Sequence, residues 1–293
     1  MGPAASHCAS CLQCVGVFDG HQGALTAALA AQHMPQLLHS ALLGRALASS
    51  ADTRRLPDAR GGAGSAALSA FEAAVAAAFL SFDRWWRDAR CDPALTQHGW
   101  DESGATALVG LVAGDTLTVG NAGDGAALLA RGGRAHRLSE EHRAGSNAAE
   151  LERVLSAGGR VVTLWPGAAA RVAGSTGPAS SWASMVTRSL GDFAFKHPHP
   201  ILSPEPALRS VALTPSDSLL LVATDGVTDV LPDDDALAIA VDAVERGRQV
   251  TDDGAALARA AAAAVARSAL VWGSDDNVTA AVMLFDWTAH ESL

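Results

Sequence analysis

Residues 106–130, which read TALVGLVAGDTLTVGNAGDGAALLA, decide the class of fold. Within them, residues 106–112 and 116–121 are apolar runs separated by Ala113-Gly114-Asp115. That spacing predicts a β-hairpin with a three-residue loop. Residues 126–130 form a third apolar run directly after the hairpin. The sequence therefore predicts an antiparallel sheet in the middle of the chain.

Helices and further strands are predicted on both sides of this sheet. Apolar residues recur at helical spacing over residues 24–43 and 66–90, and helices with acidic first turns are predicted further on. Residues 45–65 and 166–184 are rich in small and polar residues and read as loops. Strand runs bracketed by helix pairs predict an α+β fold. The remaining predicted elements are helices over 147–157, 233–244 and 253–270, and strands over 15–18, 208–213, 219–223 and 278–285.

Composition excludes several classes of protein. The 293 residues carry 31 acidic and 21 basic side chains, so the formal net charge is −10, which argues against a nucleic-acid groove. Hydrophobic residues make up 49% of the chain, which is enough for a packed core and too many for a disordered protein. No apolar run approaches the roughly 20 residues needed to span a bilayer. We expect one domain over residues 15–287 after a short segment, residues 1–14, and a monomer rather than an oligomer.

Three of the four cysteines lie close together near the start of the chain, at Cys8, Cys11 and Cys14. Their spacing suits a shared metal ion, but the fourth ligand that zinc or an iron–sulfur cluster needs is missing, and reduced thiols are the alternative. Gly2 fits the myristoylation pattern nominally, next to an unfavourable Pro3. We expect an intracellular protein of the cytoplasm or nucleus, with a plastid or a lipid-anchored membrane location as alternatives.

Aspartates stand where several apolar runs begin or end. Asp19 ends residues 15–18, Asp225 follows residues 219–224, and Asp276 precedes residues 278–285. Carboxylates from distant segments are the oxygen ligands that Mg²⁺ or Mn²⁺ prefer, so one hypothesis is a carboxylate site for metal ions. The alternative is a set of solvated turn aspartates, because Asp-Gly is a common turn dipeptide. Two further candidates for the site are Asp124 and Asp229.

A series of segments in this order resembles the metal-dependent protein serine/threonine phosphatases of type 2C. The series begins with Val17-Phe18-Asp19-Gly20-His21-Gln22-Gly23 and runs to about residue 285. The resemblance implies two packed antiparallel β-sheets flanked by helices, a four-layer αββα sandwich with a metal pair at one end. The other matching segments are Ser103-Gly104-Ala105-Thr106-Ala107, Gly120-Asn121-Ala122-Gly123-Asp124, Leu138-Ser139-Glu140-Glu141-His142, Glu152-Arg153 with Gly158-Gly159, Thr187-Arg188-Ser189-Leu190-Gly191-Asp192, Pro204-Glu205-Pro206, Ala223-Thr224-Asp225-Gly226-Val227-Thr228-Asp229-Val230-Leu231 and Gly273-Ser274-Asp275-Asp276-Asn277-Val278-Thr279.

The resemblance also implies the roles of individual residues. Asp19 would bridge two Mn²⁺ or Mg²⁺ ions, Asp225 and Asp276 would complete the shell of one ion, and the backbone carbonyl of Gly20 would help hold the other. Asp124 and Asp229 match positions that, with Asp225, bind a weaker third ion.

A water activated by the two ions would attack the phosphorus of a phosphoserine or phosphothreonine in a phosphoprotein substrate. His21 would act as general acid, giving a proton to the leaving alkoxide. The alternative for His21 is a satisfied polar residue at a helix start.

The chain departs from the family pattern at its beginning. An arginine that holds the substrate phosphate and a Glu-Asp pair normally precede the Asp-Gly-His element, and the first 18 residues contain neither. Arg45, Arg54 and Arg188 are candidate substitutes for that arginine. Besides an active phosphatase, the sequence leaves open a pseudophosphatase that binds phosphoproteins without turnover. It also leaves open a metal-dependent hydrolase of small phosphorylated metabolites.

Overall fold

The computed structural model describes residues 12–51, 63–92, 94–96, 101–174, 182–285 and 287. Two four-stranded antiparallel sheets form the centre of the molecule. In the first sheet the strand order is β1 (Leu12–Val17), β4 (Ala107–Ala113), β5 (Thr116–Ala122) and β11 (Ala207–Ala212). In the second it is β13 (Ala280–Leu284), β12 (Asp217–Ala223), β6 (Ala126–Arg131) and β7 (Arg134–Arg137).

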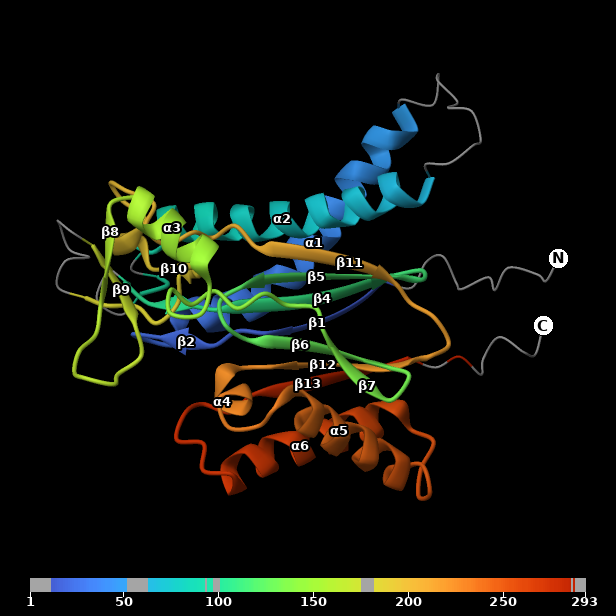
Figure 1. Ribbon diagram of the computed structural model, residues 1–293. Coiled ribbons are helices and arrows are strands. Elements are labelled where there is room, and N and C mark those ends of the chain that lie inside the picture. The colour runs from blue at the N-terminus through green and yellow to red at the C-terminus, as the bar shows by residue number, and fades with distance from the viewer. Residues whose placement is uncertain are drawn as a thin grey trace.

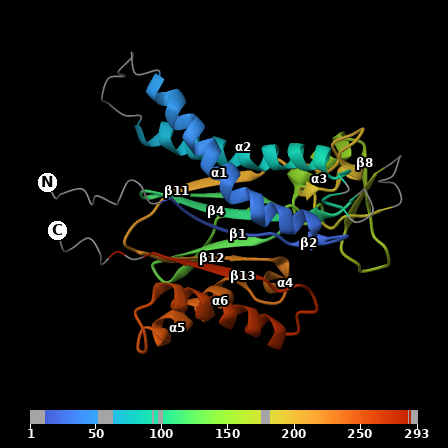
Figure 2. The same ribbon diagram turned by 180° about the vertical axis from the view of Figure 1, so that it is seen from behind.

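The two sheets pack face to face between two pairs of helices, which confirms the expected four layers (Figure 1). Helices α1 (Leu25–Ala51) and α2 (Ala63–Ala89) cover the first sheet, and α5 (Asp233–Gly247) and α6 (Gly254–Val271) cover the second. The view from behind shows α1 crossing the outer face of the first sheet (Figure 2). Apolar side chains fill the layer between the sheets, among them Val17, Leu108, Leu117, Leu129 and Val222. This burial of apolar surface holds the sandwich together.

The predicted hairpin is present, with Ala113 of β4 paired to Thr116 of β5. The strands β11 and β12 do not form a hairpin, although only residues 213–216 connect them, because they lie in different sheets. The chain thus crosses between the sheets after β5 and again after β11. The first crossing joins the ends of two central strands, β5 and β6, and the second joins the edge strand β11 to the central strand β12.

Some predicted boundaries are wrong. Residues 166–184 were expected to form a loop, but β9 (Arg171–Gly174) lies within them and pairs with β8 (Gly159–Val162). The expected loop over 45–65 is helical as far as Ala51 and again from Ala63, and the residues between lie outside the described part. The last strand begins at Ala280 and is only half buried, since it lies at the edge of its sheet.

One helix is long and apolar enough to cross a membrane by length and composition, namely the 18-residue α6. The sequence was expected to contain no apolar run long enough to span a bilayer, so this helix was not anticipated. Its Leu257, Ala261, Val265 and Ala269 are buried, and the helix packs against α5 and β13. An apolar face of this kind is also what a core-facing helix presents to a sheet.

A small three-stranded sheet lies at one end of the sandwich, with β3 (Gly104–Ala105) between β10 (Leu190–Gly191) and β2 (Gly20–His21). Near it are α3 (Ala148–Ser156) and the short helices α4 (Asp225–Thr228) and η2 (Phe193–Phe195). This end of the molecule carries most of the residues that the sequence singled out.

Candidate active site

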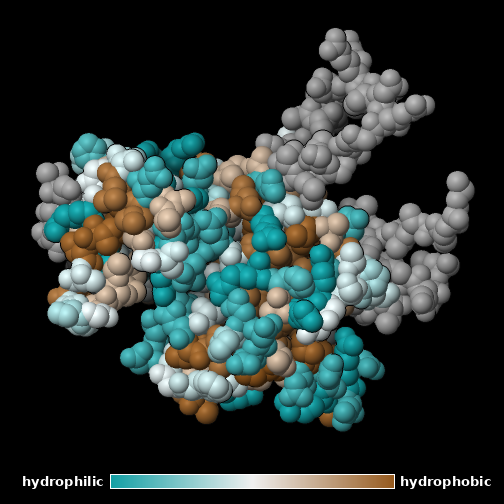
Figure 3. All heavy atoms as spheres, in the orientation of Figure 1, coloured by the Kyte–Doolittle hydropathy of each residue, from teal (hydrophilic) through white to brown (hydrophobic). Residues whose placement is uncertain are grey.

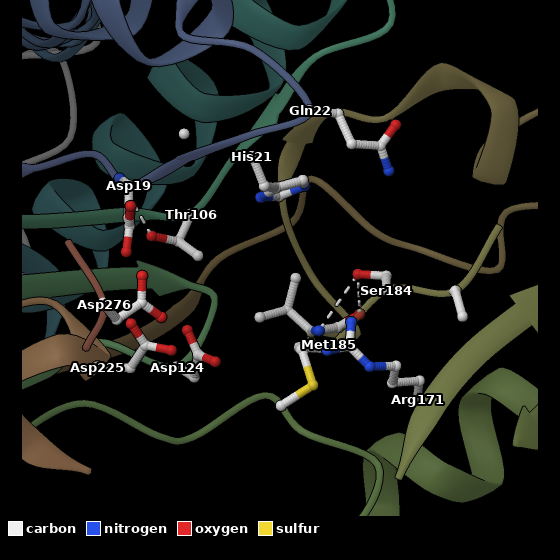
Figure 4. A pocket seen from close by; sticks show the side chains of 13 residues that line it. Asp19, His21, Gln22, Thr106, Asp124, Arg171, Ser184, Met185, Asp225 and Asp276 are labelled. Atoms are coloured by element: carbon white, nitrogen blue, oxygen red, sulfur yellow. Dashed lines mark hydrogen bonds between the residues drawn. The ribbon is translucent and has the colours of Figure 1, made fainter. Parts of the chain in front are cut away.

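Four of the five aspartates that the sequence singled out line one pocket of about 260 Å³ (Figure 4). Asp19 follows β1, and Asp124 lies between β5 and β6. Asp225 is the first residue of α4, directly after β12, and Asp276 stands just before β13. His21 and Gly20 line the same pocket, whereas Asp229 does not. Segments more than two hundred residues apart therefore meet at one end of the sandwich.

Close backbone packing brings Asp225 and Asp276 together. The hydroxyl of Thr224 donates a hydrogen bond of 3.0 Å to the backbone carbonyl of Asn277. A Cβ on Gly226 would overlap that same carbonyl, so only glycine permits this approach of α4 to the Asp276 loop. The Asp-Gly pair at 225–226 is therefore a site of close packing rather than a hairpin turn.

The aspartates carry more negative charge than the pocket compensates. Burial raises the pKa of Asp19, and the charges of Asp276 and Asp124 raise it further. Burial and then the charge of Asp124 raise the pKa of Asp225 to about 7, against an opposing effect of Arg143. Carboxylates that raise each other's pKa in this way favour the binding of a cation.

Arg143 supplies part of that positive charge, and the sequence analysis missed it. Its Nε lies 2.7 Å from Asp124 Oδ2, and its Nη2 lies 2.7 Å from Asp225 Oδ2. The same guanidinium contacts both carboxylate oxygens of Asp229 at 3.1 Å. The side chain therefore occupies the centre of the three carboxylates that were expected to bind a weaker third ion. Its position directly after the Leu138–His142 segment was the signal that could have revealed it.

The donors present fit a hard divalent cation, although they do not yet form a closed ligand shell. Among the described residues, no three Asp, Glu, His or Cys side chains stand ready to hold one metal ion. Arg143 is the physical reason on one side of the pocket, since it holds Asp124 and Asp225. Carboxylate oxygens are the ligands that Mg²⁺ and Mn²⁺ prefer.

The metal site expected at Cys8, Cys11 and Cys14 stays a prediction, because only Cys14 of these three residues is described, as a free and exposed thiol.

His21 is held by a second residue that the sequence analysis did not single out. Its Nε2 lies 2.8 Å from Oδ2 of Asp192, whose side chain is almost fully buried. Burial lowers the pKa of His21, but the hydrogen bond and charge of Asp192, with Asp124 and Asp19, raise it to a net value above the ordinary one. A protonated imidazole at the pocket wall can donate to a leaving group.

Arg171 lies across the pocket from the carboxylates, and sequence reasoning missed this residue as well (Figure 4). It begins β9, in the region expected to be a loop. Within the described part of the chain its guanidinium has no ion-pair partner. Of the three expected substitutes, Arg188 is paired with Glu150 at 2.7 Å and does not line the pocket. The side chains of Arg45 and Arg54 lie outside the described residues.

Comparisons with known proteins show which family the chain is similar to. Residues 5–278 match the family model described as protein phosphatase 2C. The chain is 32% identical over 273 residues to "Probable protein phosphatase 2C 47" of Oryza sativa subsp. japonica, covering 92% of this chain and 59% of the relative. It is 28% identical over 276 residues to "Protein phosphatase 1A" of Mus musculus, covering 92% of this chain and 61% of that protein.

Solved structures share the fold. A serine-threonine phosphatase 2C from Toxoplasma gondii superimposes with a TM-score of 0.71 at 21% identity, covering 94% of this chain and 85% of that one. Among the curated relatives, a longer one is a "Protein kinase and PP2C-like domain-containing protein" of Arabidopsis thaliana, which is 32% identical over 270 residues. Those residues are 91% of this chain and 34% of the relative. The chain thus spans between about a third and three fifths of these three curated relatives.

Proposed function

Because this chain belongs to the protein phosphatase 2C family, we propose that it hydrolyses phosphoserine and phosphothreonine in proteins with divalent cations bound in the pocket. The observation that carries the proposal is the convergence of Asp19, Asp225 and Asp276 on one pocket, with Arg171 on its opposite side. The three carboxylates would supply ligands for the cations, and the guanidinium of Arg171 would supply a partner for a phosphate dianion.

The carboxylates and the backbone carbonyl of Gly20 are the groups that would hold Mn²⁺ or Mg²⁺. When bound, such cations lower the pKa of water and neutralise the charge that develops on the phosphate. Asp19 is the residue that would serve two ions, since the charges of both Asp276 and Asp124 act on its carboxylate. The remaining work of substrate binding and proton transfer falls to other side chains of this chain.

Arg171 is the group that would orient the substrate phosphate. Its guanidinium can donate two parallel hydrogen bonds to phosphate oxygens, which is a strong charge-assisted contact. It also offsets the repulsion that a phosphate dianion meets in a pocket lined by four aspartates.

The surface beside the pocket suits a polypeptide substrate better than a small metabolite. Apolar residues gather over α3 and β8 in the space-filling view (Figure 3). Between β8 and β9, Trp165 and Leu164 are 60% and 56% exposed. Trp182, which precedes the pocket residue Ala183, is 44% exposed. Exposed aromatic residues next to a binding pocket are typical of surfaces that bind other proteins.

The test is hydrolysis of a phosphoserine peptide by the purified chain, measured as released phosphate with Mn²⁺, with Mg²⁺ and after treatment with EDTA. We expect turnover with either cation, loss with EDTA and recovery on adding Mn²⁺. Sugar phosphates at the same concentration should be hydrolysed much more slowly. Turnover that is unaffected by chelation, or a preference for sugar phosphates, would overturn the proposal.

A further inference from the structure

The small sheet at the pocket brings His21 and Asp192 together through one residue, Gly104. The middle strand β3 pairs His21 of β2 with Gly104 on one side and Gly191 of β10 with Gly104 on the other. Asp192 directly follows Gly191, so its carboxylate reaches across Gly104 toward the imidazole. A Cβ on Gly104 would overlap that carboxylate, and the missing side chain is what leaves room for the His21–Asp192 contact.

Asp192 itself is held in an uncommon and rigid conformation. Its φ of 51° places it in the left-handed region, which side chains other than glycine adopt only under constraint. The hydroxyl of Ser189 donates to Asp192 Oδ2, the same oxygen that contacts His21. The backbone N–H of Asp192 donates to the carbonyl of Ser103 at 3.3 Å.

A buried ion pair between Asp83 and Lys196 also holds this turn in place. The backbone N–H of Gly191 donates to Asp83 Oδ1 at 2.8 Å, and the ammonium of Lys196 lies 2.7 Å from the same oxygen. Asp83 comes from α2 and is paired with a lysine, so it does not serve His21. Two buried carboxylates therefore meet at this turn: Asp83 of α2 supports its backbone, and Asp192 of the turn itself faces the imidazole.

We propose that Asp192 is a positioning residue that fixes the His21 ring through Nε2, so that Nδ1 is the nitrogen that delivers the proton to the leaving oxygen. This inference rests on the proposed phosphatase function. A water oxygen bonds to phosphorus and releases one proton to solvent. The bond from phosphorus to the serine or threonine oxygen breaks, and its electron pair stays on that oxygen, which takes the proton from Nδ1. His21 is left neutral, with its remaining proton on Nε2 and facing Asp192. Asp192 contacts neither the substrate nor the phosphate, and acts only through the His21 ring.

The first test does not depend on catalysis. Nitrogen NMR of the full chain labelled with ¹⁵N-histidine, with His21→Gln used to assign the signal, reports which ring nitrogen carries a proton. We expect a protonated, slowly exchanging Nε2 in the wild type, and loss of that protection in Asp192→Asn and in Gly104→Ala. The second variant displaces the carboxylate without altering either partner. A neutral ring protonated only on Nδ1 in the wild type, or a signal that neither variant changes, would overturn the proposal.

The second test compares leaving groups. Asp192→Asn should lower kcat for a phosphoserine peptide by about 10²-fold, the usual size of a general-acid effect. It should leave kcat for p-nitrophenyl phosphate nearly unchanged, because that leaving group needs little protonation. Adding Asp192→Asn to His21→Ala should cost nothing further. Equal losses on both substrates would overturn the inference.

Asp83→Asn is the matched control, since it weakens the same turn without touching His21. We expect it to lower both rates by the same factor, together with stability. If the wild type hydrolyses neither substrate, the proposed phosphatase function fails, and the NMR experiment still decides the role of Asp192.

Discussion

Two neighbouring aspartates at the pocket offer a sharp test at the scale of single residues. Asp276 lines the pocket, whereas the exposed Asp275 beside it does not. Asp276→Asn removes a charged oxygen ligand, so we expect Mn²⁺ affinity to fall by at least about tenfold. Asp275→Asn changes the net charge equally and should leave the affinity nearly unchanged. Calorimetric titration of both variants checks this, and equal affinities would exclude Asp276 as a ligand.

Arg143 pairs with three carboxylates that the proposed cations would also need. Arg143→Met leaves Asp124, Asp225 and Asp229 without their positive partner, so the cation-free protein should lose about 2–4 kcal/mol of stability. The same change should raise the affinity for Mn²⁺, because the ion no longer has to displace a guanidinium. Calorimetry and urea unfolding with and without Mn²⁺ measure both effects.

Arg137→Met is the control for Arg143→Met. Arg137 is paired with Asp233 at 2.6 Å, away from the pocket, so its loss should not alter Mn²⁺ binding. An Arg143 variant that binds Mn²⁺ no more tightly than the Arg137 variant would contradict the competition.

At the scale of elements, α3 is held in place by a buried carboxylate near its start. The carboxylate of Glu150 accepts hydrogen bonds from Arg188, Arg153 and the hydroxyl of Thr187. The bonds from Arg188 Nη2 and Thr187 Oγ1 are both 2.7 Å long. Burial raises the pKa of Glu150, but the hydrogen bonds from these partners lower it by more. The net pKa is about 2, against an ordinary value of 4.5. A folded-state pKa below the unfolded value means that the contribution is complete above about pH 4.5 and is lost as the pH falls toward 2.

Glu150→Gln should therefore lower the free energy of unfolding by roughly 2–3 kcal/mol at pH 7. The difference from the wild type should shrink as the pH falls below about 4.5. Urea unfolding across this range measures it, with Glu152→Gln as control, because Glu152 is an exposed residue of the same helix. A pH-independent difference would show that the ionised carboxylate does not anchor α3.

At the scale of the whole molecule, the pocket joins the two sheets. Asp19 follows a strand of the first sheet, and Asp276 precedes a strand of the second. A cation held by both binds only the folded protein, so saturating Mn²⁺ should stabilise it by about 2.7 kcal/mol at a hundred times the Kd. Thermal unfolding monitors this, and Asp276→Asn should reduce the gain. A melting temperature that does not respond to Mn²⁺ would contradict a cation shared between the sheets.

The helices, strands and aspartates could be predicted from local sequence, and the four layers from the resemblance to the type 2C phosphatases. Apolar periodicity marks the strands and helices, and Asp19, Asp225 and Asp276 stand beside the ends of such runs. The positions of Arg143, Arg171 and Asp192 depend instead on contacts between segments distant in the chain. Asp192 reaches His21 only because Gly104 pairs with both of their strands. Loop composition similarly hides β9, since its four residues gain their structure by pairing with β8.

Anomalous X-ray diffraction at the manganese absorption edge, from crystals of the chain grown with Mn²⁺, tests the central claim most directly. The account predicts anomalous peaks in the pocket, within bonding distance of carboxylate oxygens of Asp19, Asp225 and Asp276. A pocket without an anomalous peak at saturating Mn²⁺, or peaks bound only by other residues, would contradict it.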